Sequence, residues 1–297
     1  MDTLTQVVLG GAVAYAAVGK NAPRKALLWG AAFATLPDLD VLVPYDNDLD
    51  SMTFHRSWSH SWIVHSMLAP VLAFILSRFD KSFSYLQWLA IIFLAFVTHA
   101  GLDALTVYGT QLFWPFKTAP VSGGSVFIID PLYTVPLLLG FLAVLFAPRK
   151  TLSDKLMRYG FAFSCVYLLW GYGAQQWVET KAEASLAQQN MHYDHIQVSA
   201  SPLNTVLWRI IAINHDHYYE GFYSIFDKTN NVTLNQYDRG GDLIDNLETF
   251  SDFQQFAWFN KGLYKLQKHD NLVVGSDLRM GMEPHYFFRF KLAEDID

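Results

Sequence analysis

The chain has 297 residues, of which 52% are hydrophobic and 16% are charged, and its formal net charge is −6. This length accommodates one large domain or two ordinary ones, and the composition is more apolar than that of an average soluble protein. The acidic balance argues against a nucleic-acid partner, which requires a basic surface, and the single cysteine excludes an internal disulfide framework.

The apolar residues are concentrated in the N-terminal part of the chain, whereas residues 179–297 are charged throughout. No basic segment precedes the first apolar run, so we expect a retained helix there rather than a signal peptide. The second run has 11 residues, roughly 16 Å of helix, which is short for a bilayer core of about 30 Å. The pattern predicts an α-helical membrane bundle of about six spans, at Leu4–Gly19, Ala26–Leu36, Trp62–Ser77, Leu86–Val107, Phe127–Ala147 and Tyr159–Val178.

Basic residues predict the orientation of these spans, because they are enriched in cytoplasmic loops. They cluster at 20–25, at Arg78 and Lys81, and at Arg149, Lys150, Lys155 and Arg158. Alternating spans place all three clusters on one side. We therefore expect a multi-pass protein of the bacterial inner membrane, with both termini, the 37–61 segment and residues after 178 on the periplasmic side.

The C-terminal part has a different pattern. Residues 176–194 read as a polar helix that leaves the membrane, and a short helix is expected around Ser251–Phe259. Short runs rich in β-branched and aromatic residues predict strands at 196–200, 206–213, 218–226, 272–275 and 286–292. We thus predict a membrane domain over 1–178 and a small α+β, mostly antiparallel, extramembrane domain over 179–297.

Two stretches carry groups that suit a divalent metal, because carboxylate oxygen and neutral imidazole nitrogen are both metal ligands. The first holds Asp38, Asp40, His55 and His60, and the second is His99-Ala-Gly-Leu-Asp103. Residues i and i+4 share one helix face, so the last pair projects together. With about 26 Å of rise from Leu86, Asp103 lies near the non-cytoplasmic edge, where the first stretch also emerges.

Each of these groups has a simpler interpretation. His99 and Asp103 would also serve as a hydrogen-bonded pair that locks two helices, although ionisable residues within spans are usually functional. The Asp-Leu-Asp sequence after Pro37 would also suit a helix end followed by a solvated loop. Arg56 is a candidate anion clamp, because a guanidinium matches two phosphate oxygens. We expect a solvated acidic loop at Asp46/Asp48/Asp50 and a helix start at Asp130. We expect a surface turn at His215-Asp216-His217.

The motifs resemble those of the bacterial inner-membrane, metal-dependent hydrolases that include LexA-regulated members. The resemblance is strongest over about residues 1–180. Longer members of the family have an extra domain, which is similar to features of this chain at 201–204, Trp208 and 276–281. The resemblance is carried by Leu36-Pro-Asp-Leu-Asp40, by His55-Arg-Ser-Trp-Ser-His60-Ser, and by His99-Ala-Gly-Leu-Asp103 with Thr106 and Gly109 after it.

That family is similar to zinc-dependent phospholipase C and related nucleases, whose His/Asp sites hold several zinc ions. The resemblance implies one or more divalent ions, zinc first with magnesium or manganese as alternatives. It implies metal ligands among Asp38, Asp40, His55, His60, His99 and Asp103. Family members usually carry Thr-His near the start, whereas this chain has Thr5-Gln6, which removes one ligand.

The leading hypothesis is a membrane-bound, metal-dependent hydrolase of phosphoester bonds in a lipid or lipid-linked substrate. In it, Arg56 holds the phosphate and Asp40 acts as the base. A divalent-metal transporter is one alternative, although transporters often show internal repeats and midplane sites. A catalytically silent scaffold that binds membrane lipids or envelope proteins through residues 179–297 is the other.

Overall fold

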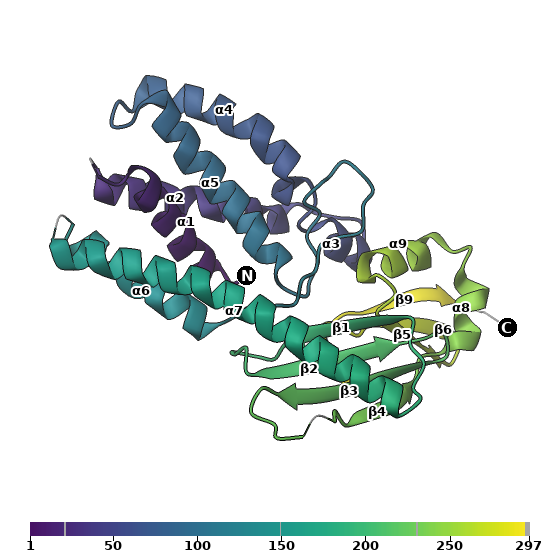
Figure 1. The fold of residues 1–297 in the computed structure, drawn as a ribbon. Helices are drawn as coiled ribbons and strands as arrows, with labels where there is room; N and C mark the ends of the chain where they lie inside the picture. Colours follow the sequence, from purple (N-terminus) through teal and green to yellow (C-terminus); the bar gives the residue numbers. More distant parts are fainter. Residues whose placement is uncertain (21, 149, 230, 295–297) are drawn as a thin grey trace.

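The computed structural model describes residues 1–294 except 21, 149 and 230. A helical part is joined to a part built of strands and short helices (Figure 1). The helical part consists of α1 (Thr3–Val18), α2 (Pro23–Thr35), η1 (Pro37–Leu42, 3₁₀), α3 (Asp48–Phe54), η2 (Trp58–His60, 3₁₀), α4 (Trp62–Phe79), α5 (Tyr85–Ala104), α6 (Pro131–Phe146) and α7 (Thr151–Gln188).

The six expected membrane segments are all helical, but they are not six equivalent spans. Among the described residues, only α4 and α5 have both the length and the hydropathy of a membrane span, with 18 and 20 residues and a mean hydropathy of 1.6. α1 and α6 have 16 residues each, about 24 Å of helix, and α2 has 13. The prediction of six spans is therefore corrected to two helices of clear membrane-spanning character.

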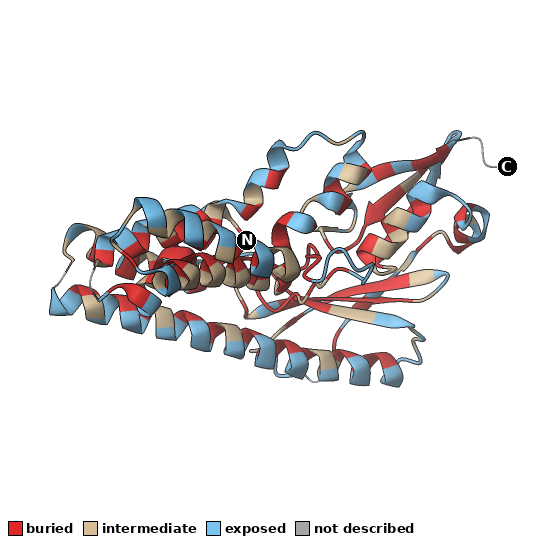
Figure 2. Ribbon diagram, turned by 90° about the horizontal axis from the view of Figure 1, so that it is seen from above, coloured by how far each residue is buried: buried red, intermediate tan, exposed pale blue. Residues whose placement is uncertain are grey.

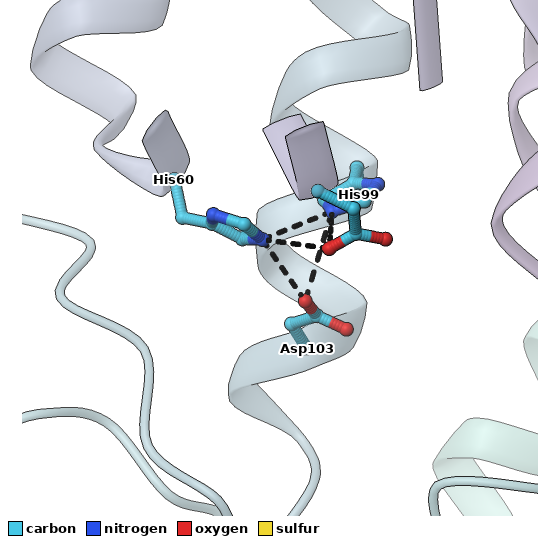
Figure 3. A group of neighbouring side chains, drawn as sticks. His60, His99 and Asp103 are labelled. Atoms are coloured by element: carbon cyan, nitrogen blue, oxygen red, sulfur yellow. Dashed lines mark hydrogen bonds and ion pairs between the residues drawn. The ribbon is translucent and has the colours of Figure 1, made fainter. Parts of the chain in front are cut away.

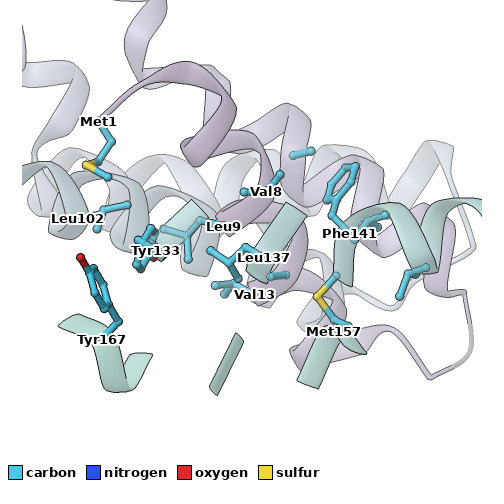
Figure 4. Close-up of a cluster of buried hydrophobic side chains, with 14 of the residues drawn as sticks. Met1, Val8, Leu9, Val13, Leu102, Tyr133, Leu137, Phe141, Met157 and Tyr167 are labelled. Atoms are coloured by element: carbon cyan, nitrogen blue, oxygen red, sulfur yellow. The ribbon is translucent and has the colours of Figure 1, made fainter. Parts of the chain in front are cut away.

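The outer faces of the bundle are apolar. Large apolar side chains on α4 and α7 are exposed, as contact with lipid requires: Met67, Val71, Phe74 and Ile75 on α4, and Phe163, Val166, Leu169 and Trp170 on α7. Inside the bundle, side chains from α1, α5, α6 and α7 form one continuous core (Figure 4). Glycines let the helices approach closely, since a Cβ on Gly10 would lie 2.5 Å from the carbonyl oxygen of Gly30.

The three loops that carry the basic clusters lie together at the end of the bundle away from the strands (Figure 1). Arg24 donates hydrogen bonds to the carbonyl oxygens of Leu145 and Phe146 at 2.7 and 3.2 Å. Lys25 Nζ lies 3.6 Å from a carboxylate oxygen of Asp80. Arg149, a member of the third cluster, lies outside the described residues.

The strand-rich part contains two antiparallel sheets and a short ribbon. The first sheet has the order β1-β2-β3-β4, the second has the order β5-β6-β9, and β7 pairs with β8. The elements are β1 (His195–Ala200), β2 (Leu207–Ile213), β3 (His217–Ser224), β4 (Leu234–Asp238), α8 (Gly241–Leu247), α9 (Ser251–Asn260), β5 (Tyr264–His269), β6 (Leu272–Asp277), β7 (Gly281–Met282), β8 (His285–Tyr286) and β9 (Arg289–Glu294). The predicted antiparallel sheet is confirmed.

Helix α7 joins the two parts. It has 38 residues, about 57 Å, and runs through the expected boundary at 178/179 without a break. Its second half buries Val178, Ala182 and Leu186 against Trp208 and its neighbours in the first sheet. The opposite side of α7 stays exposed along much of its length (Figure 2).

Helix α3 and Tyr108 pack against α9 and the second sheet. Leu49 and Met52 of α3 share an apolar cluster with Phe256 of α9 and Phe290 of β9. The hydroxyl of Tyr108 donates to the carbonyl oxygen of Met52 at 2.9 Å. The strand-rich part therefore lies directly against the residues that lead into the candidate site.

Candidate metal centre

Four of the predicted ligands converge at the end of the bundle that faces the strands. Asp38 comes from η1, directly after α2, and His60 ends η2, directly before α4. His99 and Asp103 lie one turn apart near the end of α5 and point toward His60 (Figure 3). One donor atom from each of the four residues lies within 4.8 Å of all the others.

The distances among these donors match a coordination sphere. Nε2 of His60 lies 3.0 Å from Nε2 of His99 and 3.2 Å from Oδ2 of Asp103. Oδ1 of Asp38 lies 3.4 Å from both imidazole nitrogens. Four ligands held tetrahedrally at bond lengths of about 2.1 Å would be about 3.4 Å apart. The side chains of His60, His99 and Asp103 are fully buried, whereas that of Asp38 is partly exposed.

The outer hydrogen bonds fix the tautomers of both imidazoles. Nδ1 of His99 lies 2.6 Å from the carbonyl oxygen of Ala34, which can only accept, so Nδ1 carries the proton. Ser59 donates its hydroxyl proton to Asp40 at 2.5 Å and accepts from Nδ1 of His60 at 2.9 Å. Both Nε2 atoms then present lone pairs to each other and to two carboxylates, an arrangement that a cation stabilises.

A proton on Nε2 of His60 is the alternative to a metal ion among these four donors. Burial disfavours the charged imidazole, but hydrogen bonds to Asp103 and Asp38 raise the pKa of His60 above its ordinary value. In that protonated state, burial of Asp38 is outweighed by its contacts with His60 and His99, which lower its pKa. Two carboxylates and two neutral imidazoles are also donor types that a divalent ion accepts. The residues present therefore fit a metal, which would compete with protons for them.

Asp40 and His55 form a pair beside the four donors rather than among them. In a 3₁₀ helix each residue turns by about 120°, so Asp38 and Asp40 point in different directions. Oδ1 of Asp40 lies 2.8 Å from Nδ1 of His55, and Oδ2 accepts from Ser59 and from the backbone N–H of Arg56 at 2.9 Å. Burial opposes ionisation of Asp40, but its hydrogen bonds with His55 lower its pKa. Asp40 thus orients His60 through Ser59.

Arg56 is buried at the edge of the cluster. Its Nε lies 3.1 Å from Oδ2 of Asp103, and its guanidinium lies 5.0 Å from the centre of the Tyr108 ring. Its Nη1 has no hydrogen-bond partner among the described residues. The backbone of Arg56 has φ of +63°, a conformation that costs free energy in a non-glycine residue and occurs often at functional sites.

Gln6 also reaches the cluster. Its Nε2 donates to Oδ1 of Asp103 at 2.9 Å and to the carbonyl oxygen of His99 at 3.3 Å. Its Oε1 is buried and finds no donor among the described residues. The terminal amine of Met1 contacts the same carboxylate oxygen of Asp103.

A cavity of about 360 Å³ opens next to the cluster. Asp40 and His55 line it from one side, and Tyr108 and the 287–290 segment line it from the other. The strand-rich part therefore supplies one wall of this cavity. The exposed apolar side chains of Leu39, Val41 and Leu42 lie on η1, which also carries Asp40.

The remaining candidates from the sequence have structural roles. Asp130 caps α6, as expected for a helix start, and accepts a hydrogen bond from the hydroxyl of Tyr167 at 2.9 Å. His215 and Asp216 form an exposed pair in a turn, as expected. The expected acidic loop is helical from Asp48 onward, where Asn47 caps α3, although Asp46 and Asp48 are exposed to solvent as expected. His65 contacts the carbonyl oxygen of Ser59 at 2.7 Å and stacks on Phe96.

The sequence did not indicate several residues of the site. Ser59 stood inside a quoted motif, and a hydroxyl next to a predicted ligand is the signal that would have identified it. The carbonyl of Ala34, which fixes the tautomer of His99, leaves no trace in the sequence. The same holds for Tyr108 and the 287–290 segment, which approach the site only through the tertiary fold.

Comparisons with known proteins find one similar curated protein and one family model. The uncharacterized protein YfhP of Bacillus subtilis (strain 168) is 25% identical over 307 residues, which cover 97% of this chain and 89% of that protein. No solved structure matches the chain. A family model described as YdjM inner membrane protein matches residues 1–178, which include α1 to α6, most of α7 and all four converging donors. The chain belongs to the YdjM inner membrane protein family.

Proposed function

We propose that this protein is a membrane-bound, metal-dependent hydrolase that cleaves a phosphoester bond in a lipid or lipid-linked substrate. The observation that carries the proposal is the convergence of Asp38, His60, His99 and Asp103, with their lone pairs facing one another in a buried position. A structural pair that only locks two helices would need neither the second histidine nor the second carboxylate.

The same four residues would hold the ion, and zinc suits them best, because it prefers four nitrogen and oxygen ligands in a tetrahedron. A divalent ion supplies Lewis-acid polarisation of a phosphoryl oxygen and lowers the pKa of water to about 7. Ala34 and Ser59 hold the two imidazoles in the ligating tautomer. Such outer contacts typically change metal affinity by 10- to 100-fold.

Arg56 and the Asp40–His55 pair would act on the substrate. The free Nη1 of Arg56 offers a hydrogen bond to a phosphate oxygen at the edge of the cluster. The imidazole of His55 is partly exposed at the cavity, and Asp40 holds its Nδ1. We assign proton transfer to this pair, because a histidine oriented by a carboxylate is a common acid–base unit.

The membrane setting supports a lipid-like substrate. The cavity opens beside η1, whose exposed leucine and valine side chains would sit in the interfacial region of the bilayer. We place the basic end of the bundle in the cytoplasm and the metal centre at the periplasmic face. In this arrangement, residues 1–178 carry the metal site and residues 179–297 form a periplasmic domain that completes the cavity.

Metal analysis of the purified full-length protein tests the proposal. Ala variants of His60, His99 and Asp103 should each lose bound metal relative to the wild type, because the loss of one ligand weakens the whole coordination sphere. His217→Ala is the matched control and should retain it, since His217 starts β3 in the other part of the protein. If His217→Ala lost metal and His99→Ala kept it, the metal site would lie in the strand-rich part and the proposal would be wrong.

Activity is tested separately with a phosphodiester reporter and with phospholipid vesicles. Hydrolysis by the metal-loaded wild type should be abolished by a chelator and restored by added zinc. Arg56→Lys should raise KM, because a lysine cannot offer the same two-pronged contact to phosphate. A protein that binds metal but hydrolyses neither substrate would contradict the hydrolase and favour a scaffold or transporter.

A further inference from the structure

A second cavity lies where the segments after α5 meet the strand-rich part. Its volume is about 130 Å³, and none of the four converging donors lines it. The walls are mostly apolar, with Val107 and Phe127 on one side and Phe222, Met280 and Phe287 on the other. Its polar lining residues are Ser199, Ser201, Arg209 and Arg279.

Arg209 of β2 is buried, with 6% of its surface exposed. Its Nε donates to Glu220 at 2.6 Å and its Nη1 donates to the carbonyl oxygen of Leu278 at 2.7 Å. Its Nη2 has no partner among the described residues. One side of this guanidinium is therefore fixed in place while the other side remains unsatisfied.

Arg279, two residues after the end of β6, is similarly buried, with 4% of its surface exposed. Its Nε and Nη2 donate to the carboxylate of Asp277 at 3.0 and 2.7 Å, and its guanidinium lies 5.1 Å from the centre of the Phe259 ring. Its Nη1 is buried and unpartnered among the described residues, as is the hydroxyl of Ser201.

A buried arginine of the strand-rich part does not have to carry an unpartnered donor. Arg239 is also buried, yet its Nε, Nη1 and Nη2 all donate to carbonyl oxygens, those of Tyr264, Asn214 and Gly262. A buried N–H group without an acceptor is unfavourable, so a group left in this state deserves an explanation. Two such arginines on one small cavity indicate a missing acceptor.

We infer that this cavity binds an anionic amphiphile, with a compact acceptor-only headgroup against Arg209 and Arg279 and a short apolar portion against the surrounding side chains. A carboxylate or a phosphate monoester accepts hydrogen bonds from both guanidinium groups at once. Because Glu220 and Asp277 hold the arginines in place, little conformational freedom is lost when the anion binds. The apolar lining excludes a purely polar ligand.

Calorimetric titration of the full-length protein in phosphatidylcholine nanodiscs tests this site. Hexanoate and hexyl phosphate distinguish the two headgroup sources, hexanamide removes the charge, and inorganic phosphate removes the tail. At least one of the first two should bind, and hexanamide and inorganic phosphate should bind at least about tenfold more weakly, as expected for the loss of one charge-assisted hydrogen bond or of apolar contact.

Variants locate the binding. Arg279→Lys keeps a positive charge beside Asp277 but removes the free Nη1, and Ser201→Val fills the cavity without touching either ion pair. Both should weaken binding of the preferred amphiphile by about tenfold or more, whereas Arg239→Lys should not. The inference would be overturned if neither amphiphile bound, or if hexanamide bound as tightly as the preferred amphiphile. It would also be overturned if inorganic phosphate bound more tightly than that amphiphile, or if both variants kept the wild-type affinity. Metal content should not change in any of these variants.

Discussion

Gln6 stands where the resemblance of the sequence motifs implies a histidine. It touches Asp103 and the backbone of His99 through its Nε2, and its buried Oε1 has no donor among the described residues. An amide oxygen is a weak ligand for zinc, whereas an imidazole nitrogen is a strong one. The position is therefore within reach of the four donors but contributes little to holding an ion.

We predict that Gln6→His increases metal affinity by about tenfold or more, because it adds an imidazole to the coordination sphere. Equilibrium binding of zinc to the purified protein measures this, with the stoichiometry determined in the same titration. Gln6→Leu is the control, since it removes the amide without supplying a ligand. Unchanged affinity and stoichiometry in Gln6→His would mean that residue 6 lies outside the metal site.

The types of residue at the centre were predictable from sequence, but their division of labour was not. The His99/Asp103 spacing fixes one helix face, and His60 and Asp38 stood in the same short stretch. Asp38 and Asp40 are chemically identical and two residues apart, so only the 3₁₀ conformation of η1 separates them. The backbone turn at Arg56 likewise directs His55 and His60 to different positions.

At the scale of elements, close packing of α1 on α2 positions the candidate site. Gly10 and Gly30 face each other, and a Cβ on Gly30 would lie 2.3 Å from the carbonyl oxygen of Gly10. α2 also ends just before Asp38 and carries the carbonyl of Ala34 that holds His99. Any shift of α2 therefore moves two contacts of the metal centre.

Gly30→Ala is expected to destabilise the protein by about 1–3 kcal/mol, the usual cost of overpacking a tight contact, and to lower metal affinity. Gly173→Ala is the matched control in α7, where an added Cβ meets nothing within 4 Å; it should be neutral or slightly stabilising. Thermal unfolding of the two purified variants decides this. Equal unfolding temperatures would show that α1 and α2 separate without cost.

The elements that sequence failed to predict are those without an apolar signal. β4 (Leu-Asn-Gln-Tyr-Asp) and β5 (Tyr-Lys-Leu-Gln-Lys-His) are polar, and their strand conformation depends on pairing with β3 and β6. The predicted sixth span and the polar helix after it are one helix, α7, because no glycine or proline lies between Ala174 and Gln188. Short apolar runs predicted helices correctly but overestimated the number of spans.

At the scale of the whole molecule, the metal centre and the strand-rich part lie at one end and the basic loops at the other. The tertiary fold brings these loops together through Arg24 and Lys25, which strengthens the orientation that the basic residues predict. The number of complete spans does not affect this, because the two ends of the α4–α5 pair already define two sides. The orientation can thus be tested with exposed residues at each end.

Cysteine accessibility provides this test, because Cys165 is the only cysteine and Cys165→Ser gives a thiol-free background. Lys117→Cys lies on the side of the metal centre, Lys228→Cys lies in the strand-rich part, and Lys81→Cys lies in the loop between α4 and α5; all three positions are exposed. A membrane-impermeant maleimide added to spheroplasts should label the first two and spare the third. All three should react once the membrane is permeabilised, which controls for local accessibility. If only Lys81→Cys were labelled, the orientation would be the reverse of the predicted one. The proposed metal centre would then face the cytoplasm.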